Sequence, residues 1–463
     1  MSFLKKIRNL VTQNSNEIAV TEAVHAFSPE ALDSPPNYVF INALHAAKQG
    51  DLAKIQSYLQ FNKNYVFCRN WEDRTLLHDA VSTARVEVVK YLLEQGADAN
   101  AICKEQTPLH FAIEGDVREM ANKTPEQFLE YRKRRREVIR LLLNHHADFN
   151  IANENGEFPL HVAAKLGLFE LIDVLLSAGD DVNKLTAPPE QTDEKTVINA
   201  ARPPLLLACK YSKELKTIQL LLNKGANPNV TDQEPGYNAL HYLVAYRAAK
   251  QEKEVKESRL RDVALLLIKA GIDVNALTND VEAQTALHLA VNNDYFSLVE
   301  LLVQHGANLE LKNAKGLMPL GIAARNGDAR MAEYLLKKGA GARRSRVLFH
   351  AASCTKNDTV LRMLLDQGMD VNLPDEEGYT PIFAAIAAYS LHNVKLLMEK
   401  GVDLTQRSPK GQTVLELAFA CWGEVSNLTG ETVSQERKQA ESDAKEIIRL
   451  LGGFERPEKR LFV

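Results

Sequence analysis

A segment of about 33 residues recurs along this chain, and a single copy of it could not fold alone. In residues 153–183, a turn containing Gly156 leads into Phe158-Pro159-Leu160-His161, which opens a short helix. Proline suits the first helical turn because its φ is fixed and its missing N–H would have no partner there. Gly167 breaks this helix, and apolar residues at helical spacing carry a second one up to Gly179. Two helices this short cannot bury their apolar faces, so the copies must stack on one another.

The fourth position of a Thr-Pro-Leu-His-like tetrad marks each copy. It is held by His45, His78, His110, His161, Leu206, His241, His288, Gly321, His350, Phe383 and Glu416. Most intervals are 29 to 35 residues, and three are 45, 47 and 51 residues. The second helices end in similar segments, such as LLEQGADAN at 92–100 and LLDQGMDVN at 364–372. In these motifs the chain resembles the ankyrin-repeat family from about Ile41 to Cys421, with Leu206 and Gly321 departing from its histidine.

The resemblance implies an all-α solenoid of about ten or eleven helix–turn–helix units with β-hairpin fingers over residues 41–421. Insertions interrupt it at 115–136, 184–204 and 246–262. Thr124, Pro125 and Gln127 predict a capped helix start, so that second helix begins early. Alternating charge in 246–262 predicts a lengthened, solvated helix. Residues 184–204 replace a finger turn, and their Pro-Pro pairs and β-prone residues predict an enlarged hairpin or flap. Residues 1–40 are expected to be an N-terminal segment and linker, and 422–463 an insertion, capping helix and tail.

Composition favours a soluble protein of the cytoplasm. The formal net charge is −4, which argues against a dedicated nucleic-acid binder, and no apolar run approaches the ~20 residues of a membrane span. The five cysteines are scattered and form no C-x-x-C pair, as expected for reduced thiols.

Motifs of catalysis are missing from the sequence: it has no G-x-S-x-G, H-E-x-x-H, Walker A or Rossmann glycine pattern. Most histidines occupy the tetrad position, where the family resemblance implies hydrogen bonds to the tetrad threonine and neighbouring backbone. His145-His146 lacks a third ligand nearby. We therefore expect no enzyme, catalytic residue, metal or cofactor. An alternative is a Cys-dependent hydrolase concealed in the C-terminal region, with Cys421 as nucleophile.

Two other features have alternative interpretations. The Arg-rich run at 132–136 could be a nuclear-import or phosphate-binding patch, but nearby glutamates favour a solvated helix face. Asparagines close many units, and a turn-capping role is expected for them: Asn100, Asn150, Asn183, Asn229, Asn275 and Asn372. The family resemblance also implies that such asparagines can be hydroxylated.

The resemblance implies a concave surface of finger tips and first helices that holds a folded domain or an extended peptide. Matching the family's variable positions gives these partner-binding candidates: Trp71, Arg74, Lys165, Leu166, Lys210, Tyr211, Tyr237, Tyr242, Tyr246 and Tyr379. The tyrosines that follow the 184–204 insertion form the predicted primary contact, because aromatic residues dominate interface energetics. Alternatively, these tyrosines fill irregular packing around the insertions.

The sequence therefore predicts a non-catalytic scaffold that binds another protein, with no nucleic acid and no membrane span. A second hypothesis is a bacterial effector secreted into a host cell, where it would modulate a host protein by binding it in the cytoplasm or nucleus. That hypothesis comes from the irregular insertions and the charged tail ERPEKRLFV, which resemble those of secreted stand-alone ankyrin proteins.

Overall fold

A computed structural model of the 463-residue chain describes residues 37–115, 124–187, 201–233, 235–245, 253–341, 345–427 and 435–453. Over these ranges the fold is all-α, with isolated β-bridges and no strand. The chain divides into two compact units. Unit 1 comprises Met1–Ser212 with Asn223–Ala226, and unit 2 comprises Lys213–Leu222 with Asn227–Val463.

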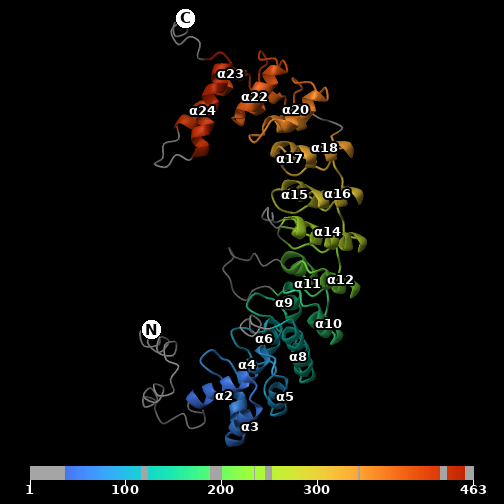
Figure 1. The fold of residues 1–463 in the computed structure, drawn as a ribbon, viewed down its shortest axis with the longest axis vertical. Coiled ribbons are helices and arrows are strands. Elements are labelled where there is room, and N and C mark those ends of the chain that lie inside the picture. The colour runs from blue at the N-terminus through green and yellow to red at the C-terminus, as the bar shows by residue number, and fades with distance from the viewer. Residues whose placement is uncertain are drawn as a thin grey trace. The chain divides into compact units, whose positions relative to one another are not determined.

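Unit 1 contains two layers of helices (Figure 1). Its elements are α2 (Asn37–Gln49), α3 (Leu52–Phe61), η2 (Lys63–Phe67), α4 (Leu76–Ser82), α5 (Val86–Glu94), α6 (Pro108–Glu114), α8 (Pro125–Asn144), α9 (Pro159–Lys165), α10 (Phe169–Ser177), α11 (Pro204–Leu207) and η3 (Ala208–Ser212). The first helices α2, α4, α6, α9 and α11 pack in succession, and the second helices α3, α5, α8 and α10 form the other layer.

Unit 2 repeats the same arrangement. Its elements are α12 (Leu215–Asn223, all but its last residue), α13 (Ala239–Val244), α14 (Lys253–Lys269), α15 (Ala286–Asn292), α16 (Phe296–Gln304), α17 (Pro319–Asn326), α18 (Ala329–Lys337), α19 (Ser345–Ala352), α20 (Thr359–Asp366), α21 (Pro381–Ala387), α22 (Leu391–Glu399), α23 (Val414–Asn427) and α24 (Gln435–Leu450). The first helices α13, α15, α17, α19, α21 and α23 again pack in succession.

A buried histidine begins most first helices and joins one finger to the next. In α4 the Thr75 backbone N–H donates to Nδ1 of His78 (3.2 Å), so Nδ1 is an acceptor and Nε2 carries the proton. Nε2 then donates to the carbonyl of Ala101 in the following finger (3.0 Å). The same forward bond is made by His110, His161, His241 and His288. The predicted role of the tetrad histidine is confirmed at these five positions.

His45 and His350 do not make the predicted tetrad hydrogen bonds, because their helices begin more than two residues before the histidine. A linking histidine is the third residue of its helix, but α2 begins at Asn37 and α19 at Ser345. His45 is exposed and lies within hydrogen-bond distance of Gln49 in its own helix. His350 has a buried Nε2 with no hydrogen-bond partner, and its ring packs where a side chain at Gly321 would lie.

Asparagines in the turns that follow several second helices form a second series of forward links. Nδ2 of Asn229 donates to the Gly271 carbonyl (3.0 Å), and its Oδ1 accepts from the Asp273 N–H (2.7 Å). Asn100 and Asn275 make equivalent pairs of bonds with the next repeat. The sequence predicted only a local turn cap for these residues. Asn150 departs from the pattern, because it bonds its own turn and Lys184.

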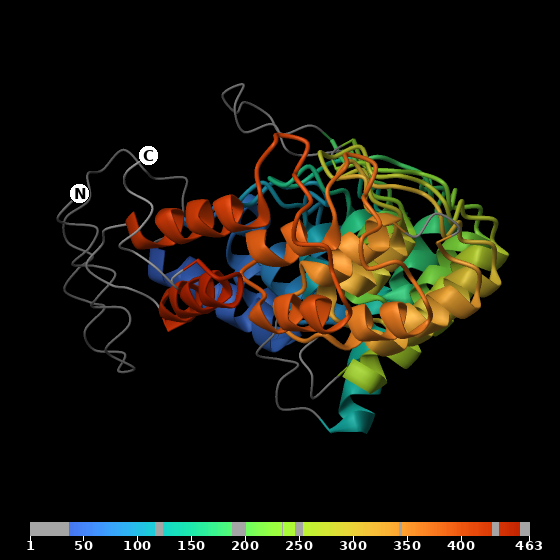
Figure 2. The ribbon, with the colours of Figure 1, turned by 90° about the horizontal axis from the view of Figure 1, so that it is seen from above.

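The first insertion lengthens a second helix, as predicted. The Thr124 hydroxyl accepts from the Gln127 N–H (3.3 Å), and Gln127 Oε1 accepts from the Thr124 N–H (3.0 Å). The resulting α8 has 20 residues, whereas α5 and α10 have 9 each. Figure 2 shows the start of α8 (teal) extending past the other helices of unit 1. Residues 116–123, in the same insertion, lie outside the described residues.

The fingers are tight turns rather than extended hairpins. In a typical finger the Asn153 N–H donates to the Glu157 carbonyl (3.0 Å), and isolated bridges pair Cys103 with Gln106 and Arg407 with Thr413. At the base of the 184–204 insertion the Thr186 N–H donates to the Arg202 carbonyl (3.1 Å). The predicted flap itself falls on residues 188–200, outside the described part of the chain.

We predict that His110→Ala lowers the free energy of unfolding by about 2 kcal/mol, because two buried hydrogen bonds are lost and the Thr107 N–H is left without its acceptor. Urea unfolding followed by circular dichroism measures this change. His45→Ala is the matched control, since His45 is exposed, and it should change stability by less than about 0.5 kcal/mol. Equal effects of the two substitutions would contradict the linking role.

We also predict that stability falls on mild acidification. Burial lowers the pKa of His78, His110, His161 and His241 to about 4, from an ordinary value of 6.5. The unfolded chain therefore binds protons first, so these groups contribute fully above about pH 6.5, and their contribution is lost as pH falls from 6.5 toward 4. The urea midpoint should decrease between pH 7 and pH 5, above the range in which exposed carboxylates titrate. A constant midpoint over that interval would refute the prediction.

Candidate functional site

The end of α9 and the turn η3 that follows α11 bring charged and aromatic side chains together in one cluster. Lys165, the last residue of α9, donates from Nζ to both carboxylate oxygens of Glu157 (2.9 and 3.1 Å). The same Nζ lies 5.3 Å from the ring centroid of Tyr211. Lys210 lies 5.1 Å from that centroid, so two ammonium groups contact one aromatic ring.

An irregular helix carries Tyr211. Pro203 and Pro204 start α11, which changes after Leu207 into the π-helical turn η3. The hydroxyl of Ser212 donates to the carbonyls of Ala208 (3.1 Å) and Ala164 (3.3 Å). The bond to Ala164 fixes the turn against α9. Such π-helical turns occur often at functional sites. Nothing in the sequence pattern signalled this one.

Apolar surface adjoins the cluster at Leu166, which follows Lys165 in the chain. Leu166 is 48% exposed and Tyr211 is 49% exposed, although both belong to closely packed elements. The structure thus brings together four of the predicted residues in unit 1: Lys165, Leu166, Lys210 and Tyr211. Glu157, which holds Lys165, is the additional residue of this cluster.

The finger residues Trp71 and Arg74 differ in accessibility. Trp71 is 84% exposed at the tip of its turn. Arg74 is largely occupied within its own unit, because its guanidinium pairs with Asp79 (2.7 Å) and lies 5.0 Å from the centroid of Phe111. Trp71 is therefore the accessible member of this pair.

The predicted tyrosines of unit 2 are mostly part of the packing. Tyr242 is buried, and its hydroxyl donates to Asp232. Tyr237 is half-buried and stacks edge-on against Tyr242 (5.3 Å between centroids). Tyr379 is half-buried beside Phe383. Tyr246 lies outside the described residues. The alternative interpretation, that these side chains fill the packing, fits Tyr242 and partly fits Tyr237.

The Arg-rich run is not simply a solvated helix face, and this corrects the favoured interpretation. Arg135 is 4% exposed and donates from Nε to the Ala112 carbonyl (3.1 Å), while Tyr131 beside it donates to the Ser82 carbonyl (3.2 Å). Gly115, with φ of 70°, is required here because a Cβ would lie 2.7 Å from the Tyr131 hydroxyl. Arg132 pairs with Glu170 (2.6 Å).

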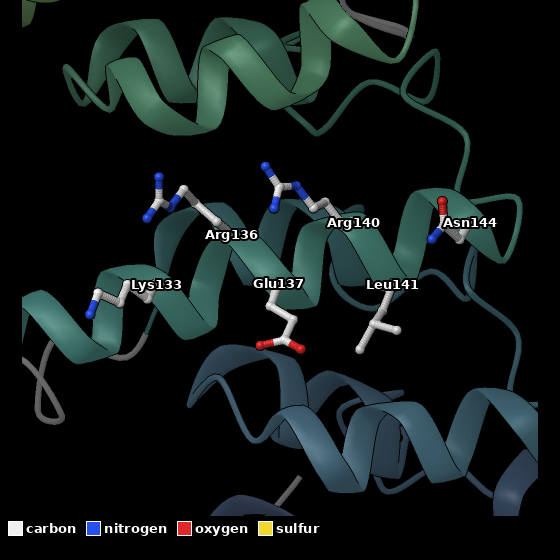
Figure 3. Close-up of a pocket in the computed structure, with 6 residues that line it drawn as sticks. All are labelled: Lys133, Arg136, Glu137, Arg140, Leu141 and Asn144. Atoms are coloured by element: carbon white, nitrogen blue, oxygen red, sulfur yellow. The ribbon is translucent and has the colours of Figure 1, made fainter.

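A shallow groove follows the exposed side of α8. Lys133, Arg136, Glu137, Arg140, Leu141 and Asn144 line it, as Figure 3 shows. Arg136 and Arg140 point to one side of the helix, whereas Glu137 and Leu141 point to the other, toward α5. The two guanidinium groups stand one helical turn apart.

Cys421 does not have the surroundings of a nucleophile. It lies in α23, is 8% exposed, and burial raises the pKa of its thiol. A reactive cysteine needs a lowered pKa and access to substrate. In the described ranges no three His, Cys, Asp or Glu side chains gather closely enough to hold a metal ion. None of the helices described there is long and apolar enough to span a membrane.

Comparison with known proteins identifies the repeats. A family model described as "Ankyrin repeats (3 copies)" matches residues 43–123, 128–186, 253–346 and 347–428, and an "Ankyrin repeat" model matches 202–233. The chain is 29% identical over 257 residues to ankyrin repeat and KH domain-containing protein mask-1 of Caenorhabditis elegans, covering 55% of this chain and 8% of that protein. It is 23% identical over 362 residues to E3 ubiquitin-protein ligase KEG of Arabidopsis thaliana (74% and 19%).

It is also 29% identical over 244 residues to human ankyrin repeat and SOCS box protein 6 (51% and 46%). The chain thus spans less than half the length of each of these relatives. Among solved structures, the ankyrin repeat domain of Bcl-3 aligns with 57% of this chain and 99% of its own, at 24% identity and a TM-score of 0.41. Because the repeat models match more than half of its residues, the chain belongs to the ankyrin-repeat family.

Proposed function

We propose that this protein is a non-catalytic scaffold that binds another protein through the first helices and fingers of unit 1, centred on Tyr211. Ankyrin repeats generally mediate protein–protein interactions. The observation that carries the choice of surface is the half-exposed ring of Tyr211, which two lysines flank, and Leu166, next to Lys165 in the chain, is also about half exposed.

The cluster has the properties of an interface centre. Tyrosine presents a large, rigid contact area with a polar end, and such residues carry much of the binding energy in interfaces. The Lys165–Glu157 bonds and the Ser212 bonds hold the elements on both sides of the ring before any partner arrives. Binding then orders few side chains, which reduces its entropic cost.

A wider contact area would include exposed finger residues of unit 1, above all Trp71. In unit 2, Tyr237 and Tyr379 are half-buried and remain contact candidates of that unit, and Tyr242 is left out because it is buried. The partner would be a folded domain or an extended peptide. A cytoplasmic location is part of the proposal, and the free thiols of all five cysteines support it.

We predict that the double substitution Leu166→Ala with Tyr211→Ala abolishes partner capture or weakens it at least tenfold, since each truncation removes exposed contact area from one centre. Affinity capture from cell extract identifies partners, and isothermal titration with the purified partner then gives Kd. Thermal unfolding should stay nearly unchanged because both side chains are about half exposed.

A matched control changes two exposed apolar residues of a unit 2 finger, Leu277→Ala with Val281→Ala. This control should bind as the original protein does. Unaltered partners and affinity in the Leu166/Tyr211 variant would rule out this surface.

A further inference from the structure

Three cations form a stripe along α8, and nothing else in the described structure neutralises them: Lys133, Arg136 and Arg140. Lys133 and Arg140 are exposed, and Arg136 is half-buried. Arg136 and Arg140 have neither a hydrogen bond nor an ion pair within the described residues, and Lys133 has only a long contact with Glu130 (3.6 Å). The carboxylates of the neighbouring helix α10 are already used, because Glu170 pairs with Arg132 (2.6 Å) and Asp173 with Lys224 (3.0 Å). The stripe therefore keeps its positive charge.

Three residues of α8 at four-residue spacing carry charge of the same sign: Arg132, Arg136 and Arg140. In α18 and at the start of α20, by contrast, a carboxylate pairs with the cation four residues further on, as in Glu333 with Lys337 (2.7 Å) and Asp358 with Arg362 (2.6 Å). Like charges at this spacing destabilise a helix. A ligand that supplies the missing negative charge would offset this cost.

We propose that the groove along α8 binds an acidic peptide segment of a partner protein in extended conformation. Four residues of helix separate Arg136 from Arg140 by ~6 Å along the axis. In an extended chain, side chains two residues apart point the same way and stand ~6.6 Å apart. A Glu-x-Glu sequence therefore places one carboxylate on each guanidinium, whose fork geometry favours two parallel hydrogen bonds.

The rest of the groove suits a peptide. Leu141 offers an apolar contact to an intervening side chain, and the Asn144 amide can both donate to and accept from a peptide backbone (Figure 3). Asn144 continues the four-residue spacing of Arg136 and Arg140 toward the end of α8, whereas Leu141 points to the side of Glu137.

The stripe is too narrow for a broad anionic surface. It is one helix wide, since Glu137 points away from the arginines, and Glu87 and Glu94 are exposed on the neighbouring α5. A flat membrane or a nucleic-acid duplex would meet Glu87 and Glu94 as well as the cations, whereas a single extended chain over Arg136 and Arg140 would avoid those two carboxylates. The surface also belongs to the second-helix layer, so it does not depend on the proposed contact at Tyr211.

The test uses the full chain and a fluorescein-labelled peptide of alternating threonine and glutamate, with binding followed by fluorescence anisotropy. The peptide should bind, and affinity should fall at least tenfold for Arg136→Glu with Arg140→Glu. The charge-preserving variant Arg136→Lys with Arg140→Lys should lose severalfold less. Because neither arginine has a partner among the described residues, circular dichroism should show no change in helix content or melting temperature.

A matched control, Lys269→Glu with Lys395→Glu, makes the same change in net charge on exposed second-helix positions of unit 2 and should leave affinity within twofold. An equal loss in this control, or no loss in the arginine variant, would overturn the proposal. So would equal binding of a peptide with glutamine in place of glutamate. Tighter binding to phosphatidylserine vesicles than to the peptide would replace the peptide with a lipid surface and likewise overturn it.

Discussion

The repeated structure depends on the two hydrogen bonds of a buried, neutral histidine ring. Its Nδ1 must accept from the backbone N–H that starts the helix, and its Nε2 must donate to the next finger, so only one tautomer satisfies both bonds. The ring therefore sets where a helix begins and where the following turn lies. Protonation would turn the acceptor into a donor and break the bond from the N–H that starts the helix, so the ring must stay neutral, and burial lowers its pKa accordingly.

Most of the fold could be predicted because its determinants are local. The tetrad fixes the helix start, and Thr124 with Gln127 fixes the start of α8. The exceptions also have a local cause: where a helix begins before the tetrad, as at His45 and His350, the ring no longer reaches the next finger. The forward bonds of Asn229 could not be read from sequence alone, since they join atoms more than forty residues apart.

The candidate surfaces were less predictable, because the exposure of a side chain depends on the irregular structure of the repeats that carry insertions. Repeat alignment marks Tyr211 and Tyr242 as equally variable, yet one stands half exposed on a π-helical turn and the other is buried against Asp232. In the same way, neighbouring residues of one basic run differ: Arg135 is buried, whereas Arg136 lines the groove without a partner among the described residues. Charge patterning predicts the helix but not which of its residues will be buried.

The forward direction of the histidine and asparagine bonds has a consequence for synthesis on the ribosome. Each unit donates from these side chains to backbone that is translated later, as Asn275 does to Gly306. A newly emerged repeat therefore cannot form these bonds until roughly one further repeat has left the exit tunnel. Where Glu416 holds the tetrad position, its carboxylate instead accepts from the Thr413 N–H (2.7 Å) within its own turn and stays exposed. That bond needs no later part of the chain.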